Sequence, residues 1–359
     1  MKKKISLILV IGCLLTTSVA SANATPQEEI HDLRFAYKIA DIYVDDDAPS
    51  TWYDQTHVET IQEGIDKATD GETIFVFNGY YYENVIIQKS IELIGQDNKK
   101  TTIVGSVNIT STEDVILSGF KFKNSGEYAT SPLIKIKESD SCTISNNFMV
   151  CDICNLHITD IYFIDIEDSS NNLIISNNIV SNPFSIFGSR SGIQIYGTSN
   201  HNIIKRNAID VYLWGIWLSQ GIDNIVYQNT ITGACVGVTL VSAYNLIGTK
   251  IVANDFINIT GIINAMSKDT LIYYNNFQYK SDEYYFTAED YGLNIQSYWY
   301  SNGEQVGNYW LDYEERYPDA TNNGQIWFTP YEIHPDDDNF VIKDKYPLVN
   351  PVDIYSIEI

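Results

Sequence analysis

The stretch Leu173-Ile-Ile-Ser-Asn177-Asn-Ile179 decides the architecture, because it returns twice more downstream. Its copies read Ile203-Ile-Lys-Arg-Asn207-Ala-Ile209 and Ile225-Val-Tyr-Gln-Asn229-Thr-Ile231. Weaker copies extend the series, so that the marking asparagines, 21 to 31 residues apart, are Asn146, Asn177, Asn207, Asn229, Asn254 and Asn275. Self-similarity at such a period is typical of a solenoid, which stacks one supersecondary unit many times.

A second repeat runs in another phase of the same period: Gly192-Ile-Gln-Ile195, Gly215-Ile-Trp-Leu218 and Gly237-Val-Thr-Leu240. The apolar positions alternate over runs that are too short for helices, so they indicate β-strands. Strands of successive coils would lie about 4.8 Å apart and pair in parallel. Asparagines at equivalent bends can then bond to one another along the stack. We therefore predict an all-β fold, a single-stranded parallel β-helix.

The two ends of the chain depart from this repeat. A basic start, an apolar run and small residues predict a secretory signal peptide at 1–24, followed by a lead-in segment at 25–44. The β-helix is expected at 45–283, and 284–359 should form an irregular C-terminal cap rich in aromatic residues. No later stretch is apolar enough to anchor the mature chain in a membrane.

A short amphipathic helix should cover the N-terminal end of the β-helix. Thr56-His-Val-Glu59 has the pattern of a capping box. The apolar residues that follow on one helical face are Val58, Ile61, Ile65 and Ala68. Such a helix would shield the open strand edge at the end of the solenoid.

The composition argues against nucleic acid as a partner. The chain carries 22 basic and 46 acidic residues, a formal net charge of −24 at pH 7. Such a surface repels phosphate backbones.

Aligning the coils predicts two outward columns of side chains. The first contains Lys135, Asp165, Gln194, Trp217 and Thr239, and the second contains Lys137, Glu167 and Tyr196. In this register each lysine lies beside an acid of the next coil, which favours surface ion pairs. The lysines should lower the carboxyl pKa values, whereas a glycosidase needs one raised, so we assign no catalytic residue.

Trp217 is the candidate centre of a ligand-binding site. An outward tryptophan can stack on a sugar ring, while Gln194, Thr239 and Tyr196 bond its hydroxyl groups. The alternative is that a surface loop covers this tryptophan.

Met149, Cys151, Cys154 and His157 are a candidate metal site. Thioether, thiolates and imidazole suit Cu(I) or zinc, but a disulfide or simple packing explains the same residues. Cys142 and Cys235 are expected to be buried core thiols. The acidic loops Asp45–Asp47 and 334–338 could hold calcium, although they lack the alternating spacing of a calcium loop and solvated turns are the alternative.

Two segments near the start of the repeat region are Asn78-Gly-Tyr-Tyr-Tyr-Glu-Asn-Val85 and Lys89-Ser-Ile-Glu-Leu-Ile-Gly95, and two near its end are Gly307-Asn-Tyr-Trp-Leu-Asp-Tyr313 and Lys345-Tyr-Pro-Leu348. Together these segments resemble the NosD-like periplasmic copper-binding β-helix family. The resemblance covers roughly 41–350 and implies a right-handed parallel β-helix, export, and a role in copper delivery. The family's closing loop often has an aspartate-rich run, but here 319–324 carries fewer carboxylates.

Three functions therefore stay open. The leading hypothesis is an exported, non-catalytic β-helix protein that binds extracellular carbohydrate or a cell-surface partner. The second is a copper-binding accessory protein, and the third is a polysaccharide lyase or hydrolase.

Overall fold

The structure, a computed structural model, describes residues 40–123, 131–151, 160–181, 189–241, 245–265, 267–278, 288–290, 297–333 and 342–359. By their contacts the residues divide into a unit at 1–41 and a unit at 42–359, and every element below belongs to the second unit. The expected signal peptide lies outside the described residues. Within those residues, no helix combines the length and the apolar character needed to cross a membrane.

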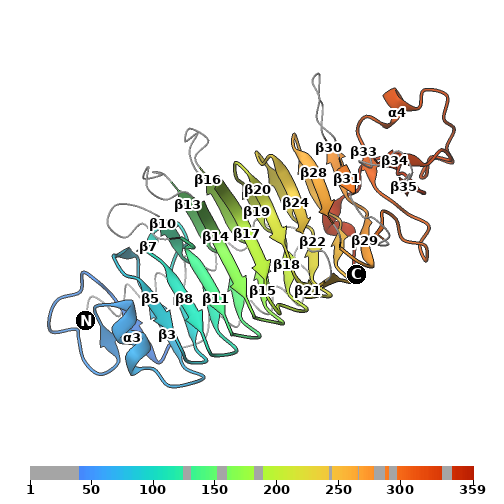
Figure 1. Ribbon diagram of the computed structural model, residues 1–359. Helices are drawn as coiled ribbons and strands as arrows, with labels where there is room; N and C mark the ends of the chain where they lie inside the picture. Colours follow the sequence, from blue (N-terminus) through green and yellow to red (C-terminus); the bar gives the residue numbers. More distant parts are fainter. Residues whose placement is uncertain are drawn as a thin grey trace. The chain divides into compact units, whose positions relative to one another are not determined.

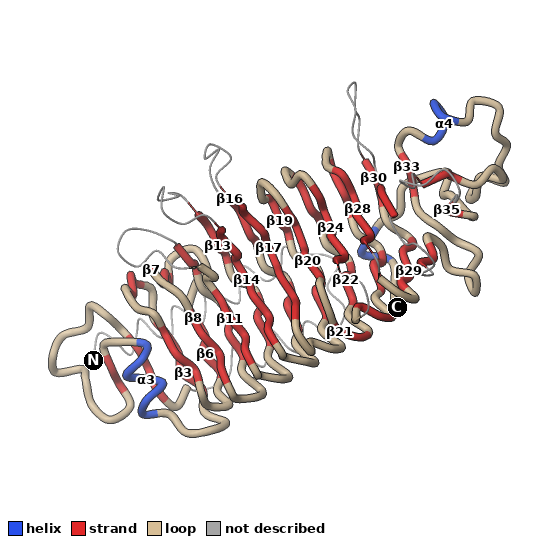
Figure 2. Tube along the Cα trace, viewed as in Figure 1, coloured by secondary structure: helices blue, strands red, loops and turns tan. Residues whose placement is uncertain are grey.

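The second unit is a parallel β-helix of three sheets, here called A, B and C (Figure 1). Each coil contributes one strand to sheet A, then one to sheet B, then one to sheet C. The strands of successive coils pair in parallel, as between β12 (Thr143–Ser145), β15 (Leu173–Ile175) and β18 (Ile203–Lys205). Figure 2 shows the strands at successive levels, joined by short loops. The predicted fold class, a right-handed parallel β-helix with few helices, is confirmed.

Sheet A consists of β2 (His57–Val58), β1 (Ile42–Val44), β3 (Thr73–Val76), β6 (Glu92–Gly95), β9 (Ile116–Ser118), β12 (Thr143–Ser145), β15 (Leu173–Ile175), β18 (Ile203–Lys205), β22 (Ile225–Tyr227), β26 (Lys250–Val252), β29 (Thr270–Tyr273) and β32 (Ser297–Tyr298). Sheet B consists of β4 (Gly79–Tyr81), β7 (Thr101–Val104), β10 (Lys121–Lys123), β13 (Phe148–Cys151), β16 (Asn178–Ser181), β19 (Ala208–Asp210), β23 (Thr230–Thr232), β27 (Asp255–Ile257), β30 (Asn276–Gln278) and β33 (Tyr309–Trp310). Sheet C consists of β5 (Val85–Ile87), β8 (Val107–Thr110), β11 (Ile134–Lys137), β14 (Asp160–Glu167), β17 (Ser189–Tyr196), β20 (Trp214–Leu218), β24 (Val236–Val241), β28 (Thr260–Ala265) and β31 (Ala288–Asp290). The remaining elements are α3 (Ile61–Lys67), α4 (Tyr313–Arg316), β21 (Gly221–Ile222), β25 (Leu246–Ile247), β34 (Tyr331–Ile333), β35 (Ile342–Asp344) and a 3₁₀ turn (Ile354–Ser356).

An asparagine ladder holds the corner between sheets A and B. In it, Asn177 Oδ1 accepts from Asn147 N at 3.0 Å, and Asn207 Oδ1 accepts from Asn177 N at 3.0 Å. The same bonds continue toward the C-terminal coils through Asn229, Asn254, Asn275 and Asn308. The predicted ladder is therefore present, but its first member is Asn147 rather than Asn146. The preceding residue, Asn146, has φ of 53°, the left-handed conformation that turns the chain at this bend.

A second ladder, which the repeat did not predict, holds the corner between sheets C and A. Asn172 N donates to Asn202 Oδ1 and Asn202 N donates to Asn224 Oδ1, each at 2.9 Å. Cys142 N donates to Asn172 Oδ1, so Cys142 occupies this corner, directly before Thr143, the register partner of Leu173. Its side chain is nevertheless fully buried, as predicted.

The helix α3 covers the N-terminal coil, but it begins later than the capping box suggested. Thr60 is its N-cap and accepts from Glu63 N at 3.2 Å, whereas His57–Val58 forms strand β2 and pairs with β1. The carboxylate of Glu83 accepts from Ile61 N and Gln62 N, each at 2.9 Å, and this satisfies two more amides of the first turn. The register Thr60-Ile-Gln-Glu63 fits the same capping rule.

Aromatic side chains pack over the last coil, as expected. Trp310 stacks on Phe277 of β30 with ring centroids 4.3 Å apart, and on Tyr331 at 4.0 Å. Beneath them, the fully buried Asp344 accepts from Trp310 Nε1 at 2.9 Å and from Asn308 N at 2.7 Å. Asp344 thus ends the asparagine ladder. A side chain at Gly307 would overlap this carboxylate, which explains the glycine of the closing motif.

Candidate ligand-binding face

The outward column predicted for sheet C is present with the expected register. Lys135 pairs with Asp165, Asp165 with Gln194, Gln194 with Trp217, and Trp217 with Thr239, on the consecutive strands β11, β14, β17, β20 and β24. Their inward neighbours, such as Ile216, are fully buried in the core. We call the outward surface of these five strands the sheet C face.

Trp217 is half-buried and stacks on Trp214 of the same strand, with ring centroids 5.7 Å apart and an interplanar angle of 27°. The sequence pattern does not predict this position of Trp214, because strict alternation does not place residues three apart on the same face. Gly215 and Ile216, which lie between the two tryptophans, are both buried on the core side of the strand, so both tryptophan side chains lie on its outer side. A side chain at Gly215 would overlap Gly237 O and Ile231, so the close approach of successive coils requires glycine.

Four buried oxygen atoms on this face have no hydrogen-bond partner within the described structure. They are Asp165 Oδ1, Ser191 Oγ, Gln194 Oε1 and Thr239 Oγ1. Ser191 is the register partner of Trp214, and the other three belong to the column of Trp217. An unpartnered buried polar group costs about 1–3 kcal/mol, so such a group is commonly satisfied by water or a ligand.

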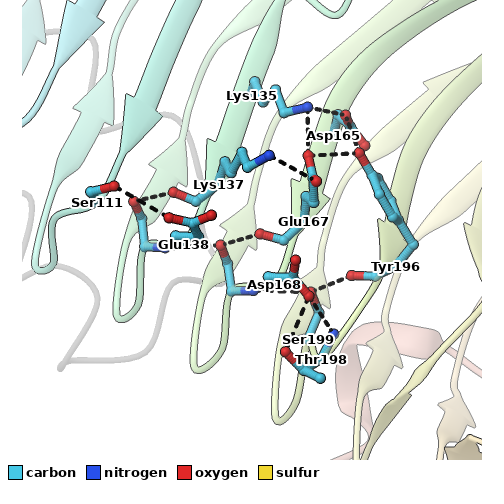
Figure 3. Close-up of polar contacts among 12 residues, drawn as sticks. Ser111, Lys135, Lys137, Glu138, Asp165, Glu167, Asp168, Tyr196, Thr198 and Ser199 are labelled. Carbon is cyan, nitrogen blue, oxygen red and sulfur yellow. Dashed lines mark hydrogen bonds and ion pairs between the residues drawn. The ribbon is translucent and has the colours of Figure 1, made fainter.

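A compact charged cluster lies on β11, β14 and β17, at the N-terminal end of the same face (Figure 3). Glu167 is 2.7 Å from Lys135 Nζ and 3.0 Å from Lys137 Nζ, and Lys135 Nζ is also 3.6 Å from Asp165 Oδ2. The hydroxyl of Tyr196 donates to Glu167 Oε2 at 3.0 Å and is 3.3 Å from Asp165 Oδ2. The predicted pairs Lys135–Asp165 and Lys137–Glu167 are confirmed, and Lys135 also bridges diagonally to Glu167.

The two carboxyl groups of this cluster differ in pKa. Hydrogen bonding to Lys135 lowers the pKa of Glu167 to about 2. Burial raises the pKa of Asp165 despite the nearby Lys135, because that side chain is only 6% exposed. The expectation that the lysines lower both pKa values is therefore wrong for Asp165, where desolvation outweighs the ion pair. Burial, followed by the two acids, raises the pKa of Tyr196.

The residues of the candidate metal site divide between the core and the undescribed part of the chain. Met149 and Cys151 alternate along β13 with fully buried side chains, and both belong to the hydrophobic core. Cys154 and His157 lie outside the described residues, so the metal site stays a prediction. Cys235 is exposed, not buried as expected, because it lies on the turn before β24.

The acidic loop Asp45–Asp47 brings its three carboxylates within 4.8 Å of one another. Part of this cluster serves local structure, because Asp46 Oδ2 accepts from Tyr80 N at 3.2 Å. The other acidic loop, 334–338, lies outside the described residues.

Comparison with known proteins agrees on the fold. No protein-family profile matches the sequence, and no curated protein matches it. Among solved structures, DFA-IIIase from Arthrobacter chlorophenolicus A6 in complex with GF2 is 12% identical over 76% of this chain and 79% of that chain, with a TM-score of 0.52. PfbA, a surface adhesin of Streptococcus pneumoniae, is 15% identical over 64% of this chain and 77% of that chain, with a TM-score of 0.46. The Dettilon tailspike protein is 15% identical over 76% of this chain and 60% of that chain, with a TM-score of 0.47. The likeness to DFA-IIIase, at a TM-score of 0.52, agrees with the observed fold and shows the fold alone.

Proposed function

We propose that the chain is an exported, non-catalytic β-helix protein that binds carbohydrate of the cell surface or its surroundings on the sheet C face. The observation that carries this proposal is the Trp214–Trp217 pair, which lies among the unpartnered oxygens of Gln194 and Thr239. Aromatic rings supply apolar area for a sugar ring, and the oxygens accept bonds from its hydroxyls. The export signal expected at 1–24 agrees with an extracellular ligand.

The test is binding of the purified protein to a glycan array, followed by titration calorimetry with the best ligand. Trp217→Ala should weaken binding by roughly tenfold or more, equivalent to about 1.4 kcal/mol. The matched control is Tyr80→Ala, which removes an exposed aromatic side chain on β4 of sheet B. Unchanged affinity of Trp217→Ala would contradict the proposal that the sheet C face binds the carbohydrate.

A second candidate function is cleavage of a polysaccharide. Asp165 and Glu167 both contact the Tyr196 hydroxyl, and their pKa values are shifted in opposite directions. A carboxyl group with a raised pKa beside an ionised carboxylate is the pattern of glycoside hydrolysis. Assays for new reducing ends and for unsaturated products on neutral and acidic polysaccharides test this candidate. Activity that disappears in both Asp165→Asn and Glu167→Gln would replace the binding proposal.

The NosD-like resemblance supplies a third candidate, a copper-binding accessory protein. Its ligands would be Met149, Cys151, Cys154 and His157, which suit Cu(I) in their chemistry. The burial of Met149 and Cys151 in the core means that such a site would need a local rearrangement of β13. Stoichiometric Cu(I) uptake that is lost in the Cys151→Ser, Cys154→Ser double variant supports this candidate, and equal uptake by that variant rejects it.

A further inference from the structure

The unpartnered atoms of the sheet C face define what kind of ligand fits it. Asp165 Oδ1 and Gln194 Oε1 are hydrogen-bond acceptors, and the hydroxyls of Ser191 and Thr239 can also accept. The complementary ligand must therefore present several donors. Sugar hydroxyls are such donors, whereas a carboxylate or sulfate group offers only further acceptors.

These atoms are spread along the helix axis. Asp165, Gln194, Trp217 and Thr239 occupy four consecutive strands in one column. At about 4.8 Å per strand, the column from Asp165 to Thr239 is about 14 Å long. A single sugar ring over Trp217 cannot reach both ends, so a chain of several sugars is needed to contact every member of the column.

The charges on this face are compensated internally. Among the described side chains of β11, β14, β17, β20 and β24, the cations are Lys135 and Lys137, and both are held by Glu167. Glu167 has each of its oxygens engaged, one by each lysine. An acidic sugar would therefore find both lysines already neutralised and would meet Asp165, within a chain of net charge −24.

We infer that the ligand is an uncharged oligosaccharide that lies along the helix axis over Asp165, Gln194, Trp217 and Thr239, with its hydroxyls donating to these side chains. This inference rests on the proposed function and adds the ligand's charge, length and direction. One ring stacks on Trp217, and the sugars on either side of that ring bond to Gln194 and Thr239. Asp165 forms one end of the site and also belongs to the charged cluster.

The experiment uses titration calorimetry of the full chain with neutral glucan, galactan, mannan and fructan oligosaccharides of two to six units. Galacturonan and alginate oligosaccharides of equal length are the acidic comparison. We expect binding of a neutral series, with affinity that rises with length until the 14 Å column is covered and that changes little with salt. Thr239→Val, which removes only the hydroxyl's bonding capacity, should weaken binding about two- to tenfold.

The control is Thr230→Val on β23, a half-buried threonine of sheet B away from this face. Melting midpoints of both variants against the unaltered protein verify that folding is retained. If Trp217→Ala abolishes binding but Thr239→Val does not weaken it, or if the acidic oligosaccharides bind more tightly, the inference is overturned while the proposed function stands. Absence of binding to every oligosaccharide overturns both.

Discussion

The asparagine ladder gives the sharpest test of how the fold is held together. Asn177 is fully buried at the corner between sheets A and B, and its Oδ1 accepts from Asn147 N and Nδ2. Its Nδ2 donates to Ile144 O at 2.8 Å and to Asn207 Oδ1 at 3.1 Å. Asn177→Ala removes these four bonds and leaves the buried Asn147 amide without its acceptor.

The expected loss follows from these contacts. An unsatisfied buried amide costs about 1–3 kcal/mol, and the bond to Ile144 O contributes a further ~1 kcal/mol. We therefore expect Asn177→Ala to lower the free energy of unfolding by roughly 2–4 kcal/mol. The matched control is Asn178→Ala, because Asn178 is the next residue and its side chain is exposed on β16. That control should change stability by less than about 0.5 kcal/mol.

Urea unfolding followed by circular dichroism measures both variants, and hydrogen exchange with mass spectrometry locates the effect. Because each coil of a solenoid contacts only its neighbours, faster exchange should centre on the coils that contain Asn147 and Asn207. Equal midpoints for Asn177→Ala and Asn178→Ala would refute the reasoning, because the ladder would then contribute nothing beyond an exposed side chain.

Three further predictions concern other parts of the chain. Burial raises the pKa of Asp344 to about 7, above its unfolded value of about 3.9. The free energy of unfolding should therefore fall by on the order of 4 kcal/mol as the pH rises from 4 to 7. Asp344→Asn should flatten this part of a curve of stability against pH. Gly307→Ala should lower the melting temperature by several degrees because its side chain would overlap the Asp344 carboxylate, whereas Gly303→Ala, with open space around it, should not. In thiol labelling of the native protein, Cys235→Ser should remove a fast-reacting group, whereas Cys142→Ser should not, because burial raises the pKa of Cys142 to about 11. An unchanged amplitude of the fast phase in Cys235→Ser would contradict the exposed position of this thiol.

The repeat in the sequence was sufficient to predict the solenoid and the register of its outward columns. The reason is that each coil repeats the same short strands and bends, so that aligning the repeats aligns neighbours in space. The ion pair between Lys137 and Glu167 follows directly from that alignment. The repeat does not by itself locate the bend between sheets A and B, because Asn146 and Asn147 both fit the pattern and only Asn147 joins the ladder.

The tertiary structure decided the properties that depend on several coils together. Trp214 joins Trp217 because Gly215 and Ile216 are both buried between them, which alternation along the strand does not reveal. The raised pKa of Asp165 depends on how completely its surroundings exclude water, a sum over many neighbours rather than over the adjacent lysine. Asp344 reaches Asn308 from 36 residues away, outside any repeat. Period and register are local and recurrent and can therefore be read from the chain, whereas desolvation and unique long-range contacts exist only once the coils are packed.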